Sequence, residues 1–91
     1  MKHNIYFDGK VQSLGLTTKY GEATVGVISQ GKFTFSTSSE ERMVVISGTL
    51  KVKLPGQNWK AMGRNAEWIV PANSSFDVEA DSDVSYICYY K

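Results

Sequence analysis

The chain has 91 residues, which is the size of one domain, and its ten Lys and Arg nearly balance its nine Asp and Glu. It has no positively charged stripe of the kind that binds nucleic acid, and no apolar run near the roughly 20 residues of a membrane-spanning helix. Cys88 is the only cysteine and His3 the only histidine, so an internal disulfide is excluded. A zinc site built from three or four ligands is not indicated either.

A domain of this size buries only about 60–65% of the surface of its unfolded chain. We therefore expect self-association to add stability. A single cysteine favours a reducing compartment, and we expect the cytoplasm.

Short apolar or alternating runs recur along the chain, each bounded by Gly, Asp, Asn or Pro. In chain order, the expected strands are residues 5–7, 10–14, 23–28, 33–37, 43–46, 49–54, 59–62, 67–70, 75–80 and 84–90. The Asp8-Gly9 pair between the first two is a hairpin signal, and we expect residues 17–21 to form a loop. Gly26 lies inside a strand, where it indicates a bulge or a close backbone approach.

Later in the chain, Lys51 and Lys53 alternate on one strand face, a pattern typical of a solvated sheet edge. Asn73 follows Pro71-Ala72 in a predicted loop and is a candidate for a left-handed backbone conformation. No window has a sustained helical period. The sequence therefore predicts an all-β fold of the sandwich or barrel class, in one domain over residues 1–91.

The spacing of Glu41, Gly48 and Pro71, followed by a strand near Phe76, resembles the two signature segments of the cupin superfamily. Cupins that bind metal also carry two histidines shortly before the glutamate and another after the proline. Here residues 35–37 and Phe76 stand at those places. The resemblance implies a cupin-like β-barrel of jelly-roll type that lacks the metal site.

A more specific resemblance covers nearly the whole chain. The segments YFDGKVQS, ATVGV, FTFST, VISG, LPG, VPANSSF and YICYY, in this order, resemble the pyrimidine/purine nucleoside phosphorylase family. That resemblance implies phosphorolysis of diverse nucleosides to a free base and ribose 1-phosphate by a homodimer, without metal or another cofactor. Two positions depart from the family pattern. Asn65 stands where a glycine is expected, and Tyr89 where members can carry an arginine; a phosphate-binding role of that arginine would have to be filled differently here.

Phosphorolysis attacks the anomeric carbon through a cationic, oxocarbenium-like state, as glycoside hydrolysis does. Glu41 is the candidate catalytic carboxylate, acting through hydrogen bonds to ribose hydroxyls or by stabilising the developing positive charge. A solvated glutamate in a loop is the alternative. Glu41, Met43 and Val45 share one face if their strand begins at Glu41.

Four residues are candidates to bind phosphate. Ser36 and Ser38, with Thr37 between them, provide hydroxyl and backbone N–H groups in one predicted loop. Arg42 is suited to bidentate contact with phosphate, and Lys10 is a second cation. Turn formation for the hydroxyl residues and solvation for the cations are the alternatives.

The candidates for nucleoside binding combine aromatic faces with smaller groups. They are Phe35, Thr37, Met43, Phe76, Tyr86 and Tyr90. Aromatic faces stack on every base, which would suit an enzyme that accepts purines and pyrimidines; filling the core is the alternative role. Cys88 is expected to be a buried, inert thiol, since no histidine lies near it to activate it.

Two other functions remain open at this point. One is a cupin-type module that binds or senses a small sugar or nucleotide without turning it over. The other is a purely structural dimer.

Overall fold

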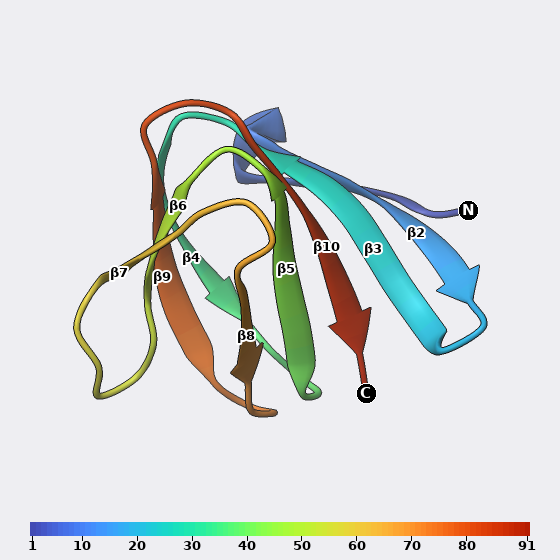
Figure 1. The fold of residues 1–91 in the computed structure, drawn as a ribbon. Helices are drawn as coiled ribbons and strands as arrows, with labels where there is room; N and C mark the ends of the chain where they lie inside the picture. The colour runs from blue at the N-terminus through green and yellow to red at the C-terminus, as the bar shows by residue number, and fades with distance from the viewer.

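The computed structural model describes residues 1–91 and consists of ten β-strands and one short 3-10 turn (Figure 1). The elements are β1 (His3–Tyr6), η1 (Phe7–Gly9), β2 (Val11–Thr18), β3 (Gly21–Ile28), β4 (Gly31–Ser36), β5 (Glu41–Ser47), β6 (Leu50–Lys53), β7 (Lys60–Met62), β8 (Glu67–Val70), β9 (Ser75–Ala80) and β10 (Val84–Tyr90). The all-β prediction is confirmed. None of these elements is a helix with the length and apolarity to cross a bilayer.

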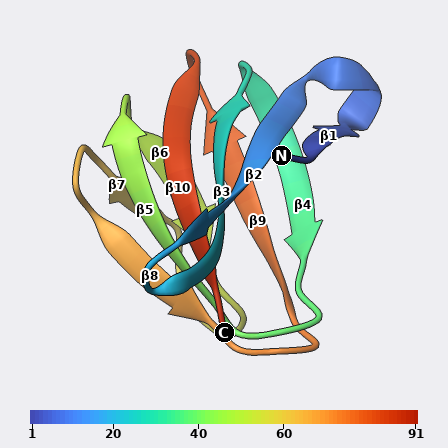
Figure 2. The same cartoon turned by 90° about the vertical axis from the view of Figure 1, so that its right-hand side faces the viewer.

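The strands form two antiparallel sheets. The larger sheet has the order β1-β2-β3-β10-β5-β8, and the smaller has the order β4-β9-β6-β7. The last strand, β10, lies in the middle of the larger sheet between β3 and β5, as Figure 2 shows. Strand pairing does not join the two sheets into one closed barrel, because each sheet keeps two edge strands.

Two local predictions are wrong. Residues 17–21 are not a loop, because β2 runs to Thr18 and β3 begins at Gly21. This hairpin is closed by polar groups: the Thr18 hydroxyl donates to the Gly21 carbonyl at 2.8 Å and accepts from the Tyr20 N–H at 3.0 Å. Lys51 and Lys53 do not mark a sheet edge either, because β6 pairs with β7 on one side and β9 on the other.

Two backbone predictions are confirmed. Asn73 has the predicted left-handed backbone, with φ 56°. Asn65, at the turn where the family pattern has glycine, has φ 68°, which was not predicted. Asparagine tolerates this left-handed region better than most residues. Gly26 marks a close approach, because a Cβ there would lie 2.6 Å from the Tyr86 hydroxyl oxygen.

The hydrophobic core lies between the sheets and contains 15 buried residues. Its fully buried aliphatic side chains, each 0% exposed, come from both sheets: Ile28, Val45, Leu50, Val70, Val78 and Val84. Each contributes about 1.5–3 kcal/mol by leaving water. This part of the interior holds the sheets together.

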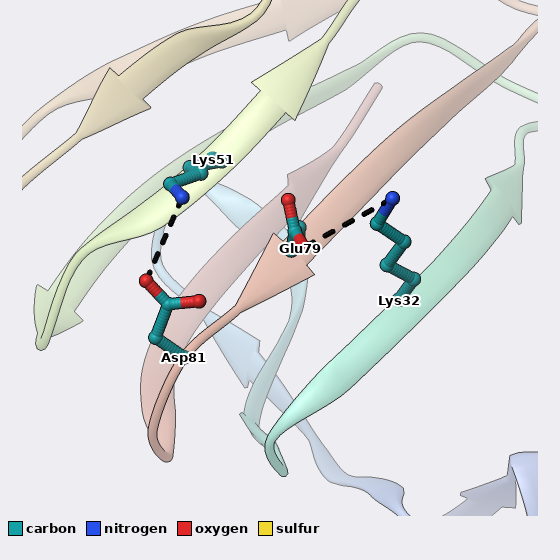
Figure 3. A network of polar contacts seen from close by, with 4 residues as sticks. All are labelled: Lys32, Lys51, Glu79 and Asp81. Carbon is teal, nitrogen blue, oxygen red and sulfur yellow. Dashed lines mark ion pairs between the residues drawn. The ribbon is translucent and has the colours of Figure 1, made fainter.

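The outer face of the smaller sheet is polar. The Lys32 Nζ lies 4.0 Å from a Glu79 oxygen, and the Lys51 Nζ lies 3.6 Å from an Asp81 oxygen (Figure 3). Each pair has at least one side chain that is 70% or more exposed, so each contributes about 0–1 kcal/mol. The outer face of the larger sheet instead carries exposed apolar side chains at Leu14, Leu16, Val25, Val27 and Ile69.

Candidate functional site

A cavity of about 330 Å³ lies between the two sheets. Only β4 contributes to it from the smaller sheet, and the remaining lining comes from β1, η1, β2, β5 and β10. Its lining residues are Tyr6, Phe7, Val11, Ser13, Thr34, Phe35, Ser36, Glu41, Met43, Tyr86, Cys88 and Tyr90. This volume lies within the range of small-molecule sites, and the mixture of aromatic faces with a few polar groups is typical of them.

Strand alternation places the chemically important side chains. Because β5 begins at Glu41, the side chains of Glu41, Met43 and Val45 share its inner face. On β10, Cys88 is the register partner of Met43, and Tyr90 is the partner of Glu41. Two neighbouring central strands therefore direct a carboxyl, a thiol and a phenol towards one space.

Glu41 is the one carboxylate in the cavity lining. Its side chain is half-buried, and Oε1 accepts a hydrogen bond from the Cys88 thiol at 3.3 Å. Burial raises the pKa of Glu41 above the ordinary value of 4.5, while the hydrogen bond from Cys88 acts in the opposite direction. None of the ion pairs in the chain includes Glu41.

Three further titratable groups of the lining are held neutral. Burial raises the pKa of Tyr86, Cys88 and Tyr90 above their ordinary values, with smaller contributions from neighbouring groups. The Tyr90 hydroxyl and the Thr24 hydroxyl are 3.0 Å apart and share a hydrogen bond. At neutral pH the two phenols and the thiol are therefore hydrogen-bond donors rather than anions.

An aromatic cluster forms one wall of the cavity. The Phe7 ring is stacked on Phe35, with centroids 6.0 Å apart and planes 19° apart, and also contacts Phe33 at 5.0 Å. Phe35 meets Phe76 edge-on at 5.5 Å, and Trp68 lies behind Phe76 at 6.3 Å. Phe7 remains partly exposed at this wall.

Six of the residues selected from sequence lie in the cavity lining: Phe35, Ser36, Glu41, Met43, Tyr86 and Tyr90. Phe76 lies behind the wall, between Phe35 and Trp68. Thr37 is buried at the end of β4. Its hydroxyl donates to the Pro71 carbonyl at 2.7 Å and accepts from the Ser74 N–H at 3.0 Å, which fixes two loops to each other.

The remaining three candidates do not line this cavity. Arg42 follows Glu41 and is therefore on the opposite face of β5, where Nη1 lies 3.3 Å from a Glu67 oxygen and the guanidinium lies 4.4 Å from the Tyr89 ring. Lys10 borders a separate depression beside His3 and Gln12. Ser38 belongs to the connection between β4 and β5.

Sequence reasoning missed five lining residues: Tyr6, Phe7, Val11, Ser13 and Thr34. The Asp8-Gly9 hairpin signal and strand alternation together contain information on three of these residues. Alternation puts Val11 and Ser13 on one face of β2, and the hairpin pairs them with Tyr6 and Asn4 of β1. No sequence signal predicts Phe7, because its φ of 52° begins three successive left-handed residues. The chain contains no group of three or more His, Cys, Asp or Glu placed to hold a metal ion.

Comparison with known proteins identifies relatives of the whole chain. The family model described as pyrimidine/purine nucleoside phosphorylase matches residues 1–90. A protein of that name from Pseudomonas syringae pv. syringae is 44% identical over 91 residues, covering 99% of this chain and 98% of its own. The protein of the same name from Yersinia enterocolitica is 44% identical over 92 residues, covering 99% and 97%.

Solved structures agree on the fold. A Vibrio parahaemolyticus protein described as of unknown function has a TM-score of 0.94 at 37% identity, covering 99% of this chain and 97% of its own. An RmlC-like cupin from Shewanella frigidimarina has a TM-score of 0.73 at 12% identity, covering 96% and 79%, which shows a shared fold alone. Because the family model and the relatives match almost every residue, the chain belongs to the pyrimidine/purine nucleoside phosphorylase family.

Proposed function

We propose that this protein is a nucleoside phosphorylase that cleaves diverse purine and pyrimidine nucleosides with inorganic phosphate, giving the free base and ribose 1-phosphate without a metal ion. The observation that carries the proposal is a half-buried carboxylate, Glu41, in an aromatic and hydroxyl-lined cavity. The names of the relatives support the same reaction class.

In this reaction a phosphate oxygen forms a bond to the anomeric carbon of ribose while the bond from that carbon to the base nitrogen breaks. The base leaves with the electron pair and takes up a proton. Positive charge develops on the sugar between these events. An enzyme needs a negative or electron-rich group beside the sugar and a cradle for phosphate.

Glu41 fits the first requirement. In its ionised form it stabilises the developing positive charge or accepts hydrogen bonds from ribose hydroxyls. Because no lysine or arginine lines the cavity, the charge of this carboxylate is not neutralised by a neighbouring cation. We therefore assign Glu41 as the catalytic carboxylate.

The lining offers hydroxyls rather than cations for phosphate. Ser36 lines the cavity, and so does Thr34, whose hydroxyl donates to Asp77 at 2.7 Å. We propose Ser36 as the first phosphate contact. For Ser38, Arg42 and Lys10, a phosphate contact would require the phosphate to extend beyond the lining or the loop to move.

The aromatic lining suits a base of either kind. Phe35, Tyr86 and Tyr90 present π-faces, and Met43 adds a polarisable side chain to the same lining. Stacking does not discriminate strongly among bases. We propose that these four residues contact the nucleoside and that Thr37 and Phe76 support the wall from behind.

The metal-free part of the proposal follows the family resemblance. Among lining residues, Glu41 and Cys88 are the only side chains of the usual zinc-ligand types, fewer than the three or four of a typical zinc site. Dialysis against EDTA should leave phosphorolysis unchanged. Loss of activity that returns with an added divalent ion would contradict this part.

We also propose a homodimer, with an exposed apolar patch on the outer face of the larger sheet as its contact. Val25 and Val27 on β3 and Leu14 and Leu16 on β2 form a continuous exposed patch there. Val27→Glu should give a monomer by sedimentation velocity. Lys51→Glu, on the polar outer face of the other sheet, is the control and should leave the dimer intact.

The reaction itself is tested by incubating the protein with uridine or adenosine, with and without phosphate, and measuring the free base. We expect base release only with phosphate. Glu41→Gln should lower turnover about 100-fold, the range found when one electrostatic contact to a transition state is removed.

Glu40→Gln is the matched control. Glu40 precedes Glu41, lies outside the cavity and forms an ion pair with Lys91 at 3.7 Å, so its loss should leave turnover unchanged. Stabilisation by nucleoside without base release would favour a sensing module instead. Full activity of Glu41→Gln would refute the site assignment.

A further inference from the structure

The Glu41 carboxylate depends on one protein partner. Its only side-chain hydrogen bond comes from the Cys88 thiol, which donates to Oε1 at 3.3 Å. A carboxylate has about four acceptor positions on its two oxygens. The Cys88 bond occupies one position on Oε1, and Oε2 has no protein partner.

The position of Cys88 is fixed by the sheet. Cys88 is 2% exposed, in the central strand of the larger sheet, with Thr24 as its register partner on one side and Met43 on the other. Glu41 lies two residues along β5 from Met43 on the same inner face. The thiol therefore reaches Glu41 diagonally across the β5–β10 pair, a contact that buried backbone holds in place.

The directly opposite residue does not share this role. Tyr90 is the register partner of Glu41, but its hydroxyl is bonded to the Thr24 hydroxyl at 3.0 Å. Arg42, the nearest cation along the strand, pairs with Glu67 on the other face of the sheet. Cys88 is thus the group that orients the carboxylate.

We propose that Cys88 is a positioning residue: its thiol holds Oε1 of Glu41 so that Oε2 remains free for the substrate. This inference rests on the proposed function of the cavity, because it names a second residue on which that function depends. The chemistry is that of a neutral donor to a charged acceptor, which favours the charged state.

The groups that face Glu41 are few. From β10 they are Cys88, Tyr86 and Tyr90, and from β1 Tyr6 lines the same cavity; none of them is a cation. Burial opposes ionisation of Glu41, and the Cys88 bond counters it. Removing the donor therefore moves the titration of Glu41 to higher pH.

Cys88→Ala and Cys88→Ser test the proposal as a matched pair, because their side chains are close in size and differ by a hydrogen-bond donor. The protonated carboxyl of Glu41 is followed by infrared spectroscopy against pH, with Glu41→Gln to identify the band. We expect a higher midpoint for Cys88→Ala than for the parent protein, and a midpoint near the parent for Cys88→Ser.

The pH profile of kcat/KM with uridine and phosphate should agree with the infrared titration. The midpoint of its acidic limb should be higher for Cys88→Ala than for the parent protein, and near the parent for Cys88→Ser. The kcat of Cys88→Ala should fall about fivefold, as expected for a weak donor to a charged group, and Cys88→Ser should recover most of it. Equal infrared midpoints in both variants would overturn the proposal. Absence of phosphorolysis in the parent would instead refute the proposed function, while the infrared titration would still decide the role of Cys88.

Discussion

Two parts of the interior share the strands β5 and β10 and differ in what they enclose. Where β6 and β9 face β5, β8 and β10, aliphatic side chains such as Leu50 and Val78 fill the space completely. Where β4 faces β5, β10 and the β1–β2 hairpin, a cavity remains, with Glu41 in its lining. Strand alternation allows β5 to serve both, through Val45 in the first part and Glu41 in the second.

Stability and chemistry are therefore separated in space within this small interior. The packed part contains no charged side chain, so it contributes to stability through the burial of apolar surface alone. The cavity part contains a carboxylate with a raised pKa, which costs stability and is useful only if it contacts a ligand. Substitutions in the two parts should therefore have different signatures.

Leu50→Ala should show the largest effect on stability. Leu50 is 0% exposed in the packed part, and shortening such a side chain costs about 3 kcal/mol of unfolding free energy by lost burial and a new cavity. Urea denaturation measures this loss, and turnover per folded molecule should not change. A loss of turnover at full folding would show that the two parts are not separate.

Gly26→Ala should damage the cavity part. The added Cβ would lie 2.6 Å from both the hydroxyl oxygen and the ring carbon Cζ of Tyr86, so the ring must move from its place in the lining. We expect a loss of about 2 kcal/mol, typical of overpacking, together with a higher KM for nucleoside. The double variant Gly26→Ala with Tyr86→Phe keeps the ring and removes the hydroxyl contact, and it should regain part of the stability.

The pH dependence of stability should identify Glu41. Because its pKa is raised in the folded protein, the folded state binds a proton more tightly than the unfolded chain, and this site loses stability as pH rises from 4.5 through the folded-state pKa. Glu41→Gln lacks this loss. The unfolding free energy of Glu41→Gln minus that of the parent should therefore increase from pH 4 to pH 7. A difference that stays constant over this range would contradict the raised pKa.

Lys32→Ala should have the smallest effect. The Lys32–Glu79 pair lies on the outer face of the smaller sheet, and the lysine side chain is 70% exposed. We expect a change of about 0.5 kcal/mol or less and no change in turnover. Thermal unfolding at low and high salt would measure it, and a loss as large as that of Leu50→Ala would mean that this face has a partner.

Much of the fold can be predicted from sequence, because alternation and turn residues are local signals. Glu41 and Met43 were placed on one face because the strand pattern fixes side-chain direction. The same alternation puts Arg42 on the opposite face of β5, away from this cavity. The extent of β2 and β3 was missed because polar threonines closed a hairpin that looked like a loop.

The missed part of the site depends on contacts distant in sequence. Phe7 reaches the cavity through a left-handed turn, and Thr34 does so because β4 alone covers that part of the larger sheet. The Cys88–Glu41 hydrogen bond joins residues 47 positions apart, through the pairing of β5 with β10. No local pattern contains such information.

We expect nucleoside to bind in the cavity and not elsewhere on the protein. Two internal methionines report on the two parts of the interior: Met43 lines the cavity, whereas Met62 packs against the hydrophobic core. Methyl NMR of protein labelled at methionine, titrated with uridine in the presence of phosphate, measures both at once. We predict that the Met43 signal shifts and the Met62 signal does not; a shift of Met62 alone, or of neither, would contradict the account.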